Sequence, residues 1–549
     1  MNEVSENKMR RLLLLFAIVM MVAPHVWAER ADNYLPDDTT VVVESTNLPI
    51  VWIDVDGAMI MRFDRIPARM KIIYNGKGRL NYADTVAHPG QTIDYEGDIA
   101  LRYRGNTSYY NSDKKPLSFR TLAEPLTAEV YDKKKVEILG MGKDNKWALL
   151  APYNDRSMIR DMLAFELARP WMEYTPDGRY CEVYLDGIYY GIYILCEVVS
   201  KGKHRLNLDD PGEEGDALTG GYIVEVGPPV VPNHMSLQHP VSNTGYVYSN
   251  SNYYFQYNWP DYNDLTRKQW TYINNAIDEM EAAFVMDNYK DPEVGYRKYV
   301  DVQSFMDYHL FNELAHNVDG YRLSAKIYKR RDSVDSRFKM ALWDFNLAFG
   351  NCNYNQGYRT DNWVYQQNAY LFNNGDPNMI PFYWYKMWKD ETYVVERKAR
   401  WKQLRENNLR SDRITATIDS LTAVLTSGGA LARDTQARPR WGQRLWPNYH
   451  VATSHEDEIA YLKNWLQKRV AWLDARFEYV EPPLPPVPPT YEKGDVNGDG
   501  DVNIADVNVL IDIVLGGSHD SETMARADVN GDNEYTIADI STLINIILE

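Results

Sequence analysis

The C-terminal part of the sequence contains the stretch DVNGDGDVNIAD at residues 495–506, and a second copy, DVNGDNEYTIAD, follows at residues 528–539. In both copies, oxygen-bearing side chains fall at loop positions 1, 3, 5, 9 and 12, which is the ligand pattern of an EF-hand calcium loop. Gly500 permits the sharp turn at position 6, and Asn533, at the same position of the second copy, also tolerates a left-handed backbone. The spacing predicts two Ca²⁺ sites, with the ligands Asp495, Asn497, Asp499, Asp501, Asp506, Asp528, Asn530, Asp532, Glu534 and Asp539.

Each loop runs into a segment with an apolar stripe at helical spacing, so two loop–helix units can bury their stripes against each other. This predicts a small all-α module. The pair closely resembles a type I dockerin from Gly494 to Glu549, and we assign residues 493–549 to it. The resemblance implies two bound calcium ions and a cohesin-bearing partner, often within complexes that degrade plant polysaccharide. The alternative is an acidic, Asn-rich surface repeat that binds no calcium.

A Pro-rich stretch, EPPLPPVPPT at residues 481–490, precedes this module. Dense proline favours an extended polyproline II spacer, so the parts on either side should fold separately. We place the linker at residues 481–492 and the body of the chain at residues 48–480.

The N-terminus has the pattern of a secretory signal. A basic start precedes an apolar run from Leu12 to Ala23, and Val26-Trp27-Ala28 offers a small residue at the cut. We assign residues 1–28 to a signal peptide and residues 29–47 to an N-terminal lead, which predicts a secreted, cell-surface or periplasmic protein. The alternative is a membrane anchor, but a span needs roughly 20 apolar residues. No membrane span is expected after removal of the signal.

The amino-acid composition excludes some classes of binding partner. The formal net charge of −18 repels phosphate backbones, so we expect no nucleic-acid binding. The 41 Tyr and 15 Trp residues suit a wet cleft or a half-exposed sheet. Three cysteines are too few for a disulfide scaffold. Cys181 and Cys196 flank a predicted hairpin, and they either pair in an oxidising compartment or stay as buried thiols.

The pattern of the body predicts an α+β fold. Alternating apolar residues with Asn-Gly or Asp-Gly turns predict strands within residues 48–120 and a hairpin at Tyr180–Val198. A further strand pair is expected at 323–328 and 338–343, and the chain should be mostly helical from about Trp384. Helical patterns with stop signals predict helices at Asp155–Arg169, Val302–Ala315 and Ile459–Phe477.

Five segments of the body, in order, resemble the CotH (spore-coat protein H) kinase family. The match runs from about residue 48 to residue 350 and more weakly to residue 477. The segments are RGNTS at 104–108 with KKPLSF at 114–119, DNKWALLAPYND at 144–155 with MIR at 158–160, LDGIYYGIYILCE at 185–197, NVDG at 317–320 and WDFNLAFG at 343–350.

This resemblance implies an atypical protein-kinase-like domain with a mostly helical C-terminal lobe, which uses ATP and Mg²⁺ to phosphorylate a secreted protein. Phosphoryl transfer needs cations on the phosphates, a carboxylate that holds magnesium and a carboxylate that orients the attacking hydroxyl. Asp319 is the candidate catalytic carboxylate, and Asp344 with Asn346 is the candidate magnesium site. The structural alternative for both aspartates is an ordinary turn residue.

Three more residues are candidates for the cofactor site. Lys115 would contact the phosphates, while Arg104 and Glu197 would complete the site, Glu197 as the ion-pair partner of a lysine. Each candidate has an alternative interpretation. In place of Lys115, Lys114 would be the family's phosphate-contacting lysine. Arg104 would only pair with a neighbouring acid, and Glu197 would be an acid on the surface at the end of a strand. The basic cluster at residues 201–205 is interpreted as a solvated loop rather than a phosphate contact.

We therefore expect a secreted CotH-type kinase-like protein tethered through its dockerin to a cohesin. The first alternative is a catalytically inactive binding, adhesion or structural protein of a polysaccharide-degrading complex, with a protein or glycan as partner, because ATP is scarce outside the cytosol. The second is a carbohydrate-active enzyme, which needs two carboxylates about 5 to 10 Å apart, although no motif supports it. The sequence lacks the Gly-rich loop and His-Arg-Asp triplet of typical kinases.

Overall fold

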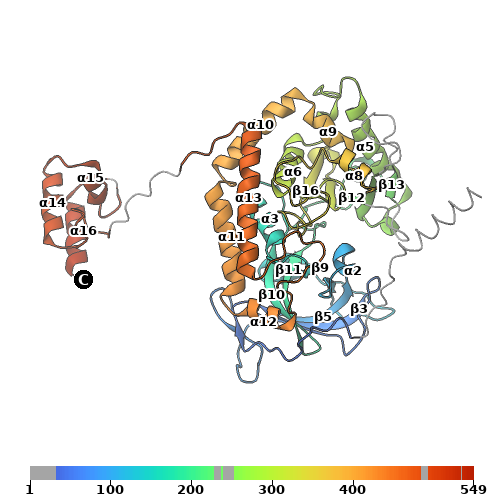
Figure 1. Cartoon of the computed structure of the whole chain (residues 1–549), viewed down its shortest axis with the longest axis horizontal. Coiled ribbons are helices and arrows are strands. Elements are labelled where there is room, and N and C mark those ends of the chain that lie inside the picture. Colours follow the sequence, from blue (N-terminus) through green and yellow to red (C-terminus); the bar gives the residue numbers. More distant parts are fainter. Residues whose placement is uncertain (1–31, 228–235, 239–252, 484–491, 533, 549) are drawn as a thin grey trace, which may run out of the picture. The chain divides into compact units, whose positions relative to one another are not determined.

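The computed structural model describes residues 32–227, 236–238, 253–483, 492–532 and 534–548. The predicted signal peptide, most of the Pro-rich linker and Asn533 lie outside the described residues. The chain divides into two compact units, Met1–Val480 and Glu481–Glu549, whose elements are labelled in Figure 1. None of the helices in the described ranges is both long and apolar enough to cross a bilayer.

A closed barrel of seven strands forms the first part of the larger unit. Strand alternation places Leu101 and Tyr103 of β5 in the barrel core, so Arg102 between them lies on the outer side. The barrel closes where β2 pairs in parallel with β10, a pairing of distant segments that the sequence did not lead us to expect. In order around the barrel the strands are β10 (Gly178–Leu185), β11 (Ile188–Glu197), β9 (Lys146–Leu150), β6 (Leu117–Thr121), β5 (Ile93–Tyr103), β3 (Ile66–Ile73) and β2 (Ile50–Asp54).

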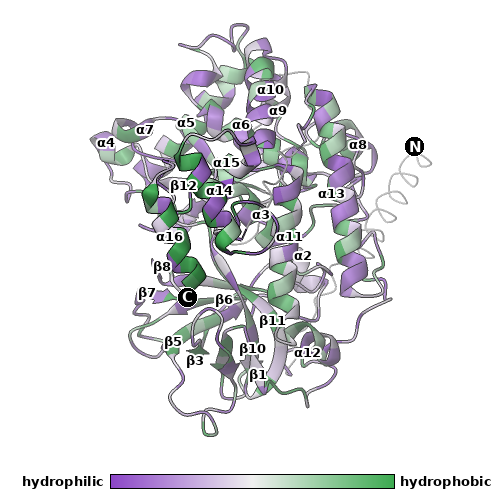
Figure 2. Ribbon diagram, turned by 90° about the vertical axis from the view of Figure 1, so that its left-hand side faces the viewer, coloured by the Kyte–Doolittle hydropathy of each residue, from purple (hydrophilic) through white to green (hydrophobic). Residues whose placement is uncertain are grey.

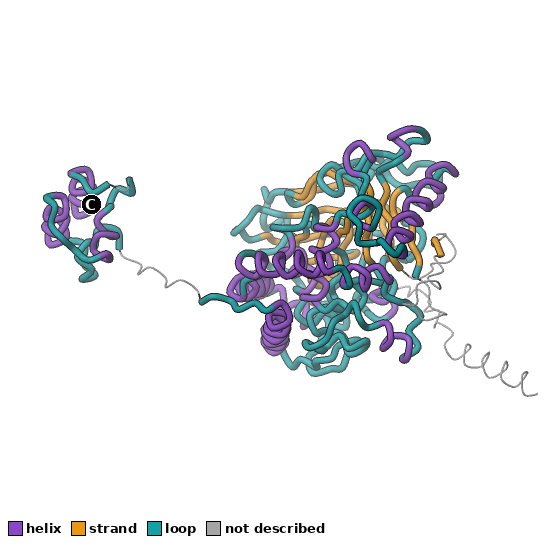
Figure 3. Tube along the Cα trace, turned by 90° about the horizontal axis from the view of Figure 1, so that it is seen from above, coloured by secondary structure: helices purple, strands orange, loops and turns teal. Residues whose placement is uncertain are grey.

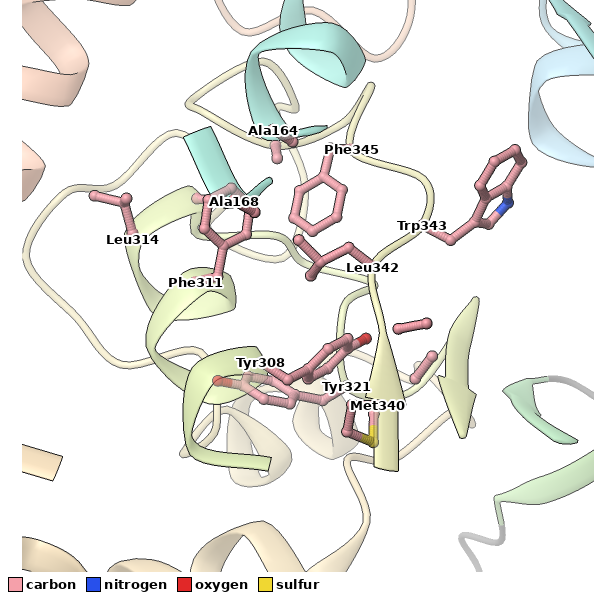
Figure 4. Packing of buried hydrophobic residues seen from close by; sticks show 14 of the residues in the cluster. Ala164, Ala168, Tyr308, Phe311, Leu314, Tyr321, Met340, Leu342, Trp343 and Phe345 are labelled. Atoms are coloured by element: carbon pink, nitrogen blue, oxygen red, sulfur yellow. The ribbon is translucent and has the colours of Figure 1, made fainter. Parts of the chain in front are cut away.

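A second sheet of five antiparallel strands follows, and its last two strands are the predicted strand pair. Its order is β13 (Ser236–Gln238), β14 (Tyr254–Trp259), β12 (Tyr222–Gly227), β15 (Ala325–Lys329) and β16 (Phe338–Ala341). Helix α6 (Val302–Ala315), which has the predicted bounds, begins at the capping residue Asp301. Figure 4 shows side chains of α6, among them Phe311, packed in one buried cluster with Phe345 and with α3 (Arg160–Ala168).

Helix α3 begins five residues later than the sequence predicts. Asp155 lies before the helix and accepts hydrogen bonds from the backbone N–H groups of Ser157, at 3.1 Å, and Arg160, at 2.8 Å. Its carboxylate also pairs with the Arg160 guanidinium at 2.5 Å. The side chain of Asp155 therefore stabilises a turn in the segment that would otherwise extend the helix.

From about Trp384 the larger unit is mostly helical, as the sequence predicts, whereas α5 (Arg267–Val285) and α8 (Asn368–Asn373) were not predicted; Figure 3 shows helices and loops around the grouped strands. The helices of this later part are α9 (Phe382–Trp388), α10 (Glu391–Glu406), α11 (Ser411–Thr426), α12 (Ala430–Ala437) and α13 (His455–Phe477). The short elements are β1 (Ser45–Thr46), β4 (Asn81–Tyr82), β7 (Val136–Ile138), β8 (Met141–Asp144), α2 (Thr107–Tyr110), α4 (Gly215–Leu218), α7 (Asp332–Asp335), η2 (Tyr262–Asp264) and η3 (Tyr296–Lys298).

The hairpin of β10 and β11 turns at Asp186-Gly187, as predicted. It places Cys181 opposite Tyr193 and Cys196 opposite Gly178, so the two cysteines do not face each other. Both are buried free thiols, as is Cys352.

The described part of the smaller unit contains three helices, α14 (Ile504–Val514), α15 (Ser521–Ala527) and α16 (Ile537–Leu548). Val507 and Leu510 of α14 share a buried cluster with Leu543 of α16. The predicted apolar stripes therefore meet in the core of this unit. Figure 2 shows α16 coloured as hydrophobic over most of its length, because further apolar residues remain on its outer side.

Candidate functional site

A cleft of about 700 Å³ brings together several of the predicted site residues. Its walls come from the end of barrel strand β5 with α2, from the end of β9, from α3, from β12 and β15, and from the segment after β16. Arg104, Asp319, Asp344 and Asn346 all line it, although they are distant in the sequence. Other lining residues include Asp161, Glu225, Ser324, Lys326 and Trp343.

Asp344 has an unusual backbone conformation for a non-glycine residue. It lies three residues beyond the end of β16, with a left-handed φ of 67°, a strained state that is enriched at functional sites. Ser324 Oγ donates to Asp344 Oδ2 at 3.0 Å, and Asn317 Nδ2 donates to the Asp344 backbone carbonyl at 3.1 Å. Burial raises the pKa of Asp344. These contacts hold a carboxylate at the cleft in one orientation.

Asp319 lies in the loop after α6 and is also largely buried. Burial raises the pKa of Asp319 to about 6, while Arg322 opposes the rise and Asp344 and Asp376 add to it. Arg322 Nη2 approaches Asp319 Oδ1 to 3.1 Å. The carboxylate is thus ionised at neutral pH and can accept a proton from a bound hydroxyl.

Asp161, in the first turn of α3, is a third acid of the cleft that the sequence analysis missed. Its Oδ1 accepts a hydrogen bond of 2.7 Å from the backbone N–H of Phe345. Burial and the nearby Asp344 raise the pKa of Asp161 to about 7. The only available signal was its place directly after the family-like segment 158–160. Oxygen donors from Asp161, Asp344 and Asn346 suit a hard cation such as Mg²⁺.

Arg104 and Lys326 supply positive charge to the cleft. The Arg104 guanidinium lies over the Trp343 ring, with its central carbon 5.0 Å from the ring centroid. Its buried Nη1 atom has no hydrogen-bond partner within the described part of the chain. Lys326 Nζ bonds to Glu225 and Asn258. An unpaired guanidinium donor at a cleft is suited to an anionic ligand.

Lys146 is a cation beside the cleft. It lies in the family-like segment 144–155, but it was not among the predicted site residues. Trp147 is buried in the barrel core, so alternation along β9 places Lys146 on the outer side of the barrel. Burial, together with Arg120, Lys326 and further cations, lowers the pKa of Lys146 to about 7. Burial and neighbouring cations are the main influences on its ammonium group, and no acid stands among them. A cation in this setting gains from a bound anion.

Lys115 and Glu197 have other surroundings than predicted. Lys115 Nζ bonds to the carbonyl of Tyr109 and lies over the rings of Tyr34 and Tyr109. Lys114 forms a buried ion pair with Asp434. Neither lysine is among the residues that line the cleft, because both point into packed regions beside the barrel.

Glu197 pairs with an arginine rather than with the predicted lysine. Its Oε1 lies 3.7 Å from Arg205 Nε, and its Oε2 accepts hydrogen bonds from the Asp177 N–H and the Tyr174 hydroxyl. Arg205 is buried over the ring of Trp147, so this part of the basic cluster at 201–205 is not the solvated loop that was expected. Glu197 is not among the lining residues either.

The two acidic loops of the smaller unit share one hydrogen-bond pattern. Asp495 accepts from the N–H groups of Gly498, Asp499 and Gly500, and Asp528 accepts from those of Gly531 and Asp532. At position 12, Asp506 and Asp539 each accept two backbone hydrogen bonds. In the second loop, carboxylate oxygens of Asp528, Asp532 and Asp539 lie within 4.8 Å of one another, close enough to share a cation.

These features define a protein of two parts. The first is a domain that has a cleft beside a barrel, lined by both acidic and basic side chains. The second is a module with two loops of the EF-hand calcium-binding type. The family model described as CotH kinase protein matches residues 101–473, and the one described as Dockerin type I domain matches residues 493–548. The chain belongs to the CotH kinase protein family and carries a C-terminal type I dockerin. A comparison with curated proteins gives no match. The dockerin accounts for calcium binding and implies a cohesin-bearing partner.

Proposed function

We propose that the chain is a secreted phosphotransferase that uses ATP and Mg²⁺ to phosphorylate a hydroxyl group of a protein, while its dockerin tethers it to a cohesin. The observation that carries this proposal is the convergence of Asp319, Asp344, Asn346 and Arg104 in one cleft. We further propose that the catalytic domain spans residues 48–480, the linker 481–492 and the dockerin 493–549. The secretory pattern of residues 1–28 and the dockerin both support an extracellular location.

Each group in the cleft has a role in this proposal. Asp344 and Asn346, supported by Asp161, would hold magnesium, which neutralises phosphate charge when it is bound. Arg104, Lys326 and Lys146 would contact the phosphates, and Lys146 replaces Lys115 as our candidate because it lies beside cations of the cleft. Asp319 would accept the proton of the acceptor hydroxyl as that oxygen attacks phosphorus.

A labelling experiment tests this function. The full chain is incubated with γ-labelled ATP, MgCl₂ and casein, beside Asp344→Asn and Asp319→Asn variants. Asp361→Asn is the matched control, because Asp361 forms an exposed ion pair with Arg359. We expect labelling by the wild type and by the control, and a loss of about 100-fold or more in the two cleft variants. Equal labelling by all four proteins, or none by the wild type, would contradict the proposal.

The dockerin presents surfaces suited to docking. Ile504 and Leu515 of the first copy and Ile537 and Leu548 of the second are strongly exposed and occupy equivalent positions in the two repeats, with Leu515 directly after the last residue of α14. Exposed apolar stripes of this kind mark protein interaction sites. We infer that a cohesin covers one or both of them. Replacing Leu515 and Leu548 together with Asp should abolish retention on immobilised type I cohesins without loss of calcium binding.

A second candidate function, binding without catalysis, is favoured by an aromatic surface of the larger unit. Trp446 stacks on Tyr354 at 7°, and Tyr449 stacks on Tyr358 at 5°. Trp446 and Tyr449 are each more than two-fifths exposed, and rigid exposed rings suit glycan or protein contacts. Affinity electrophoresis in soluble xylan and glucan gels, with Trp446→Ala as the comparison, would separate this function from catalysis.

A further inference from the structure

Arg322 connects the candidate catalytic carboxylate to a second acid that comes from a different part of the chain. Its guanidinium is almost completely buried, with an exposed fraction of 2%. One nitrogen, Nη2, lies 3.1 Å from Asp319 Oδ1, and the other, Nη1, lies 2.8 Å from Asp376 Oδ2. Asp319 follows α6, whereas Asp376 follows α8. The arginine thus bridges two carboxylates across two loops.

The bridge is held at both ends. Arg322 Nε donates to the carbonyl of Val318 at 2.9 Å, and Nη1 also donates to the carbonyl of Asn378 at 2.9 Å. Asp376 in turn accepts hydrogen bonds from Asn355 Nδ2 and from the Asn378 N–H, both at 3.0 Å. Four of the five N–H donors of the guanidinium are used, which holds it in one orientation.

We propose that Asp376 is a positioning residue, which orients the Asp319 carboxylate toward the cleft through Arg322. This inference rests on the proposed function, in which Asp319 receives the proton of the acceptor hydroxyl. Asp376 itself is not among the residues that line the cleft, so it acts through the arginine and not on a ligand.

The charges around Asp319 support this arrangement. Arg322 opposes the burial that raises the pKa of Asp319, while Asp344 and Asp376 add to the rise. Cys352 and Tyr354 are the other titratable groups near Asp319, and burial, with Asp319 next, raises the pKa of both. Arg322 forms ion pairs with two acids. If Asp376 is removed, the guanidinium can pair with Asp319 alone. That change would pull the carboxylate toward Arg322 and away from the acceptor.

Kinetics of the full chain with MgATP and casein provide the first test. Asp376→Asn should lower kcat by about 10- to 100-fold, because small misplacement of a catalytic group has effects of that size. The KM for ATP should stay unchanged, since no ATP contact is altered. Asp376→Glu should restore part of kcat, and the acidic limb of the pH profile of Asp376→Asn should move to lower pH. A wild-type kcat in Asp376→Asn, or equal losses in kcat and in ATP affinity, would overturn the inference.

A second test needs no activity and separates this inference from the proposed function. Thermal midpoints are measured for Asp319→Asn, Asp376→Asn and the double variant. Each single change leaves the buried Arg322 one acid, whereas the double change leaves it none, so we expect a loss in the double variant that exceeds the sum of the single losses. Asp361, which forms an exposed ion pair with Arg359, provides the control. When Asp361→Asn is combined with Asp376→Asn, the losses in thermal midpoint should be additive. Additivity in the Asp319 and Asp376 cycle would show that the bridge does not couple them, even if the wild type transfers phosphate.

Discussion

The Asp161 carboxylate accepts a 2.7 Å hydrogen bond from the backbone N–H of Phe345, the residue that follows Asp344. This contact joins α3 to the strained segment that carries the candidate magnesium ligand. In Figure 4 Phe345 lies beside Ala164 and Ala168 of α3, while Trp343 points to the other side. The apolar packing and the hydrogen bond therefore act on the same segment, in which Asp344 stands between Trp343 and Phe345 in the sequence.

Asp161 should give the folded protein a measurable pH dependence. Burial and Asp344 raise the pKa of Asp161 from 3.8 to about 7. A carboxyl with a raised pKa in the folded state contributes stability that is complete below its unfolded pKa and is lost as pH rises through the folded pKa. The stability of wild type relative to Asp161→Asn should therefore fall between about pH 4 and about pH 7 and change little above that range. Urea unfolding at several pH values measures it, and a flat difference, like that expected for Asp361→Asn, would contradict it.

Lys146→Met should stabilise the unliganded protein and weaken nucleotide binding. Burial and neighbouring cations lower the pKa of Lys146 to about 7, so its charged form is unfavourable in the folded state. The stability that it contributes is lost as pH falls from its unfolded pKa toward 7. At pH 7 we expect a gain of ~1 kcal/mol in the free energy of unfolding, and a loss of about 10-fold in MgATP affinity by calorimetry. Lys143→Met, an exposed neighbour, should change neither.

Much of the cleft could be predicted from short segments. Arg104, Asp319, Asp344 and Asn346 were found because each stands in a family-like segment, and the structure places all four in one cleft. Lys146 was inside such a segment but could not be chosen, because its direction depends on which face of β9 enters the barrel. That depends on the closure of β2 onto β10, a long-range pairing without local signal.

Long-range ion pairs limited the remaining predictions. Lys114 pairs with Asp434, which is 320 residues away, so sequence spacing could not show that Lys114 is a structural residue. Glu197, by contrast, pairs with a residue close in the sequence, Arg205, and this pair was missed because the charges of segment 201–205 favoured a solvated loop. Local patterns located the strands, the hairpin and α6, because these depend on alternation and turns within a few residues.

Loss of Asp434 should destabilise the larger unit strongly. Its carboxylate contacts Lys114 and lies 2.8 Å from Arg440 Nη2, and all three side chains are buried. Although burial alone would raise it, these cations hold the pKa of Asp434 well below its ordinary value. Asp434→Ala leaves two buried cations without an acid, which should cost about 3–5 kcal/mol at pH 7. Urea unfolding measures this cost.

The Asp434 carboxylate should also make the stability of the protein sensitive to acid, and a second substitution should recover part of the stability that Asp434→Ala loses. A depressed pKa contributes stability that is present above the unfolded pKa and is lost as pH falls below about 4, so the cost of Asp434→Ala should shrink at pH 3. Adding Lys114→Met to Asp434→Ala should recover part of the lost stability, because one unpaired charge is removed. If the double variant is less stable than Asp434→Ala, the ion pair does not explain the effect.

Calcium binding should require the two position-12 carboxylates. Asp506 accepts hydrogen bonds of 2.9 Å from the N–H groups of Asn497 and Asn503, and Asp539 has the same role in the second loop. Each carboxylate therefore joins its loop to the helix that follows, and calcium would strengthen that junction, since binding to the folded state alone adds about 2.7 kcal/mol at 100 times Kd.

Calorimetry of the full chain should give two sites for wild type, one for Asp506→Ala and none for Asp506→Ala with Asp539→Ala. Asp512→Asn changes an exposed acid that bonds to His519 outside the loops. It should retain both sites, because Asp512 is not one of the loop oxygens that would replace the hydration shell of the ion. Two sites in the double variant would mean that other oxygens hold the calcium and that the repeated pattern is not its binding site.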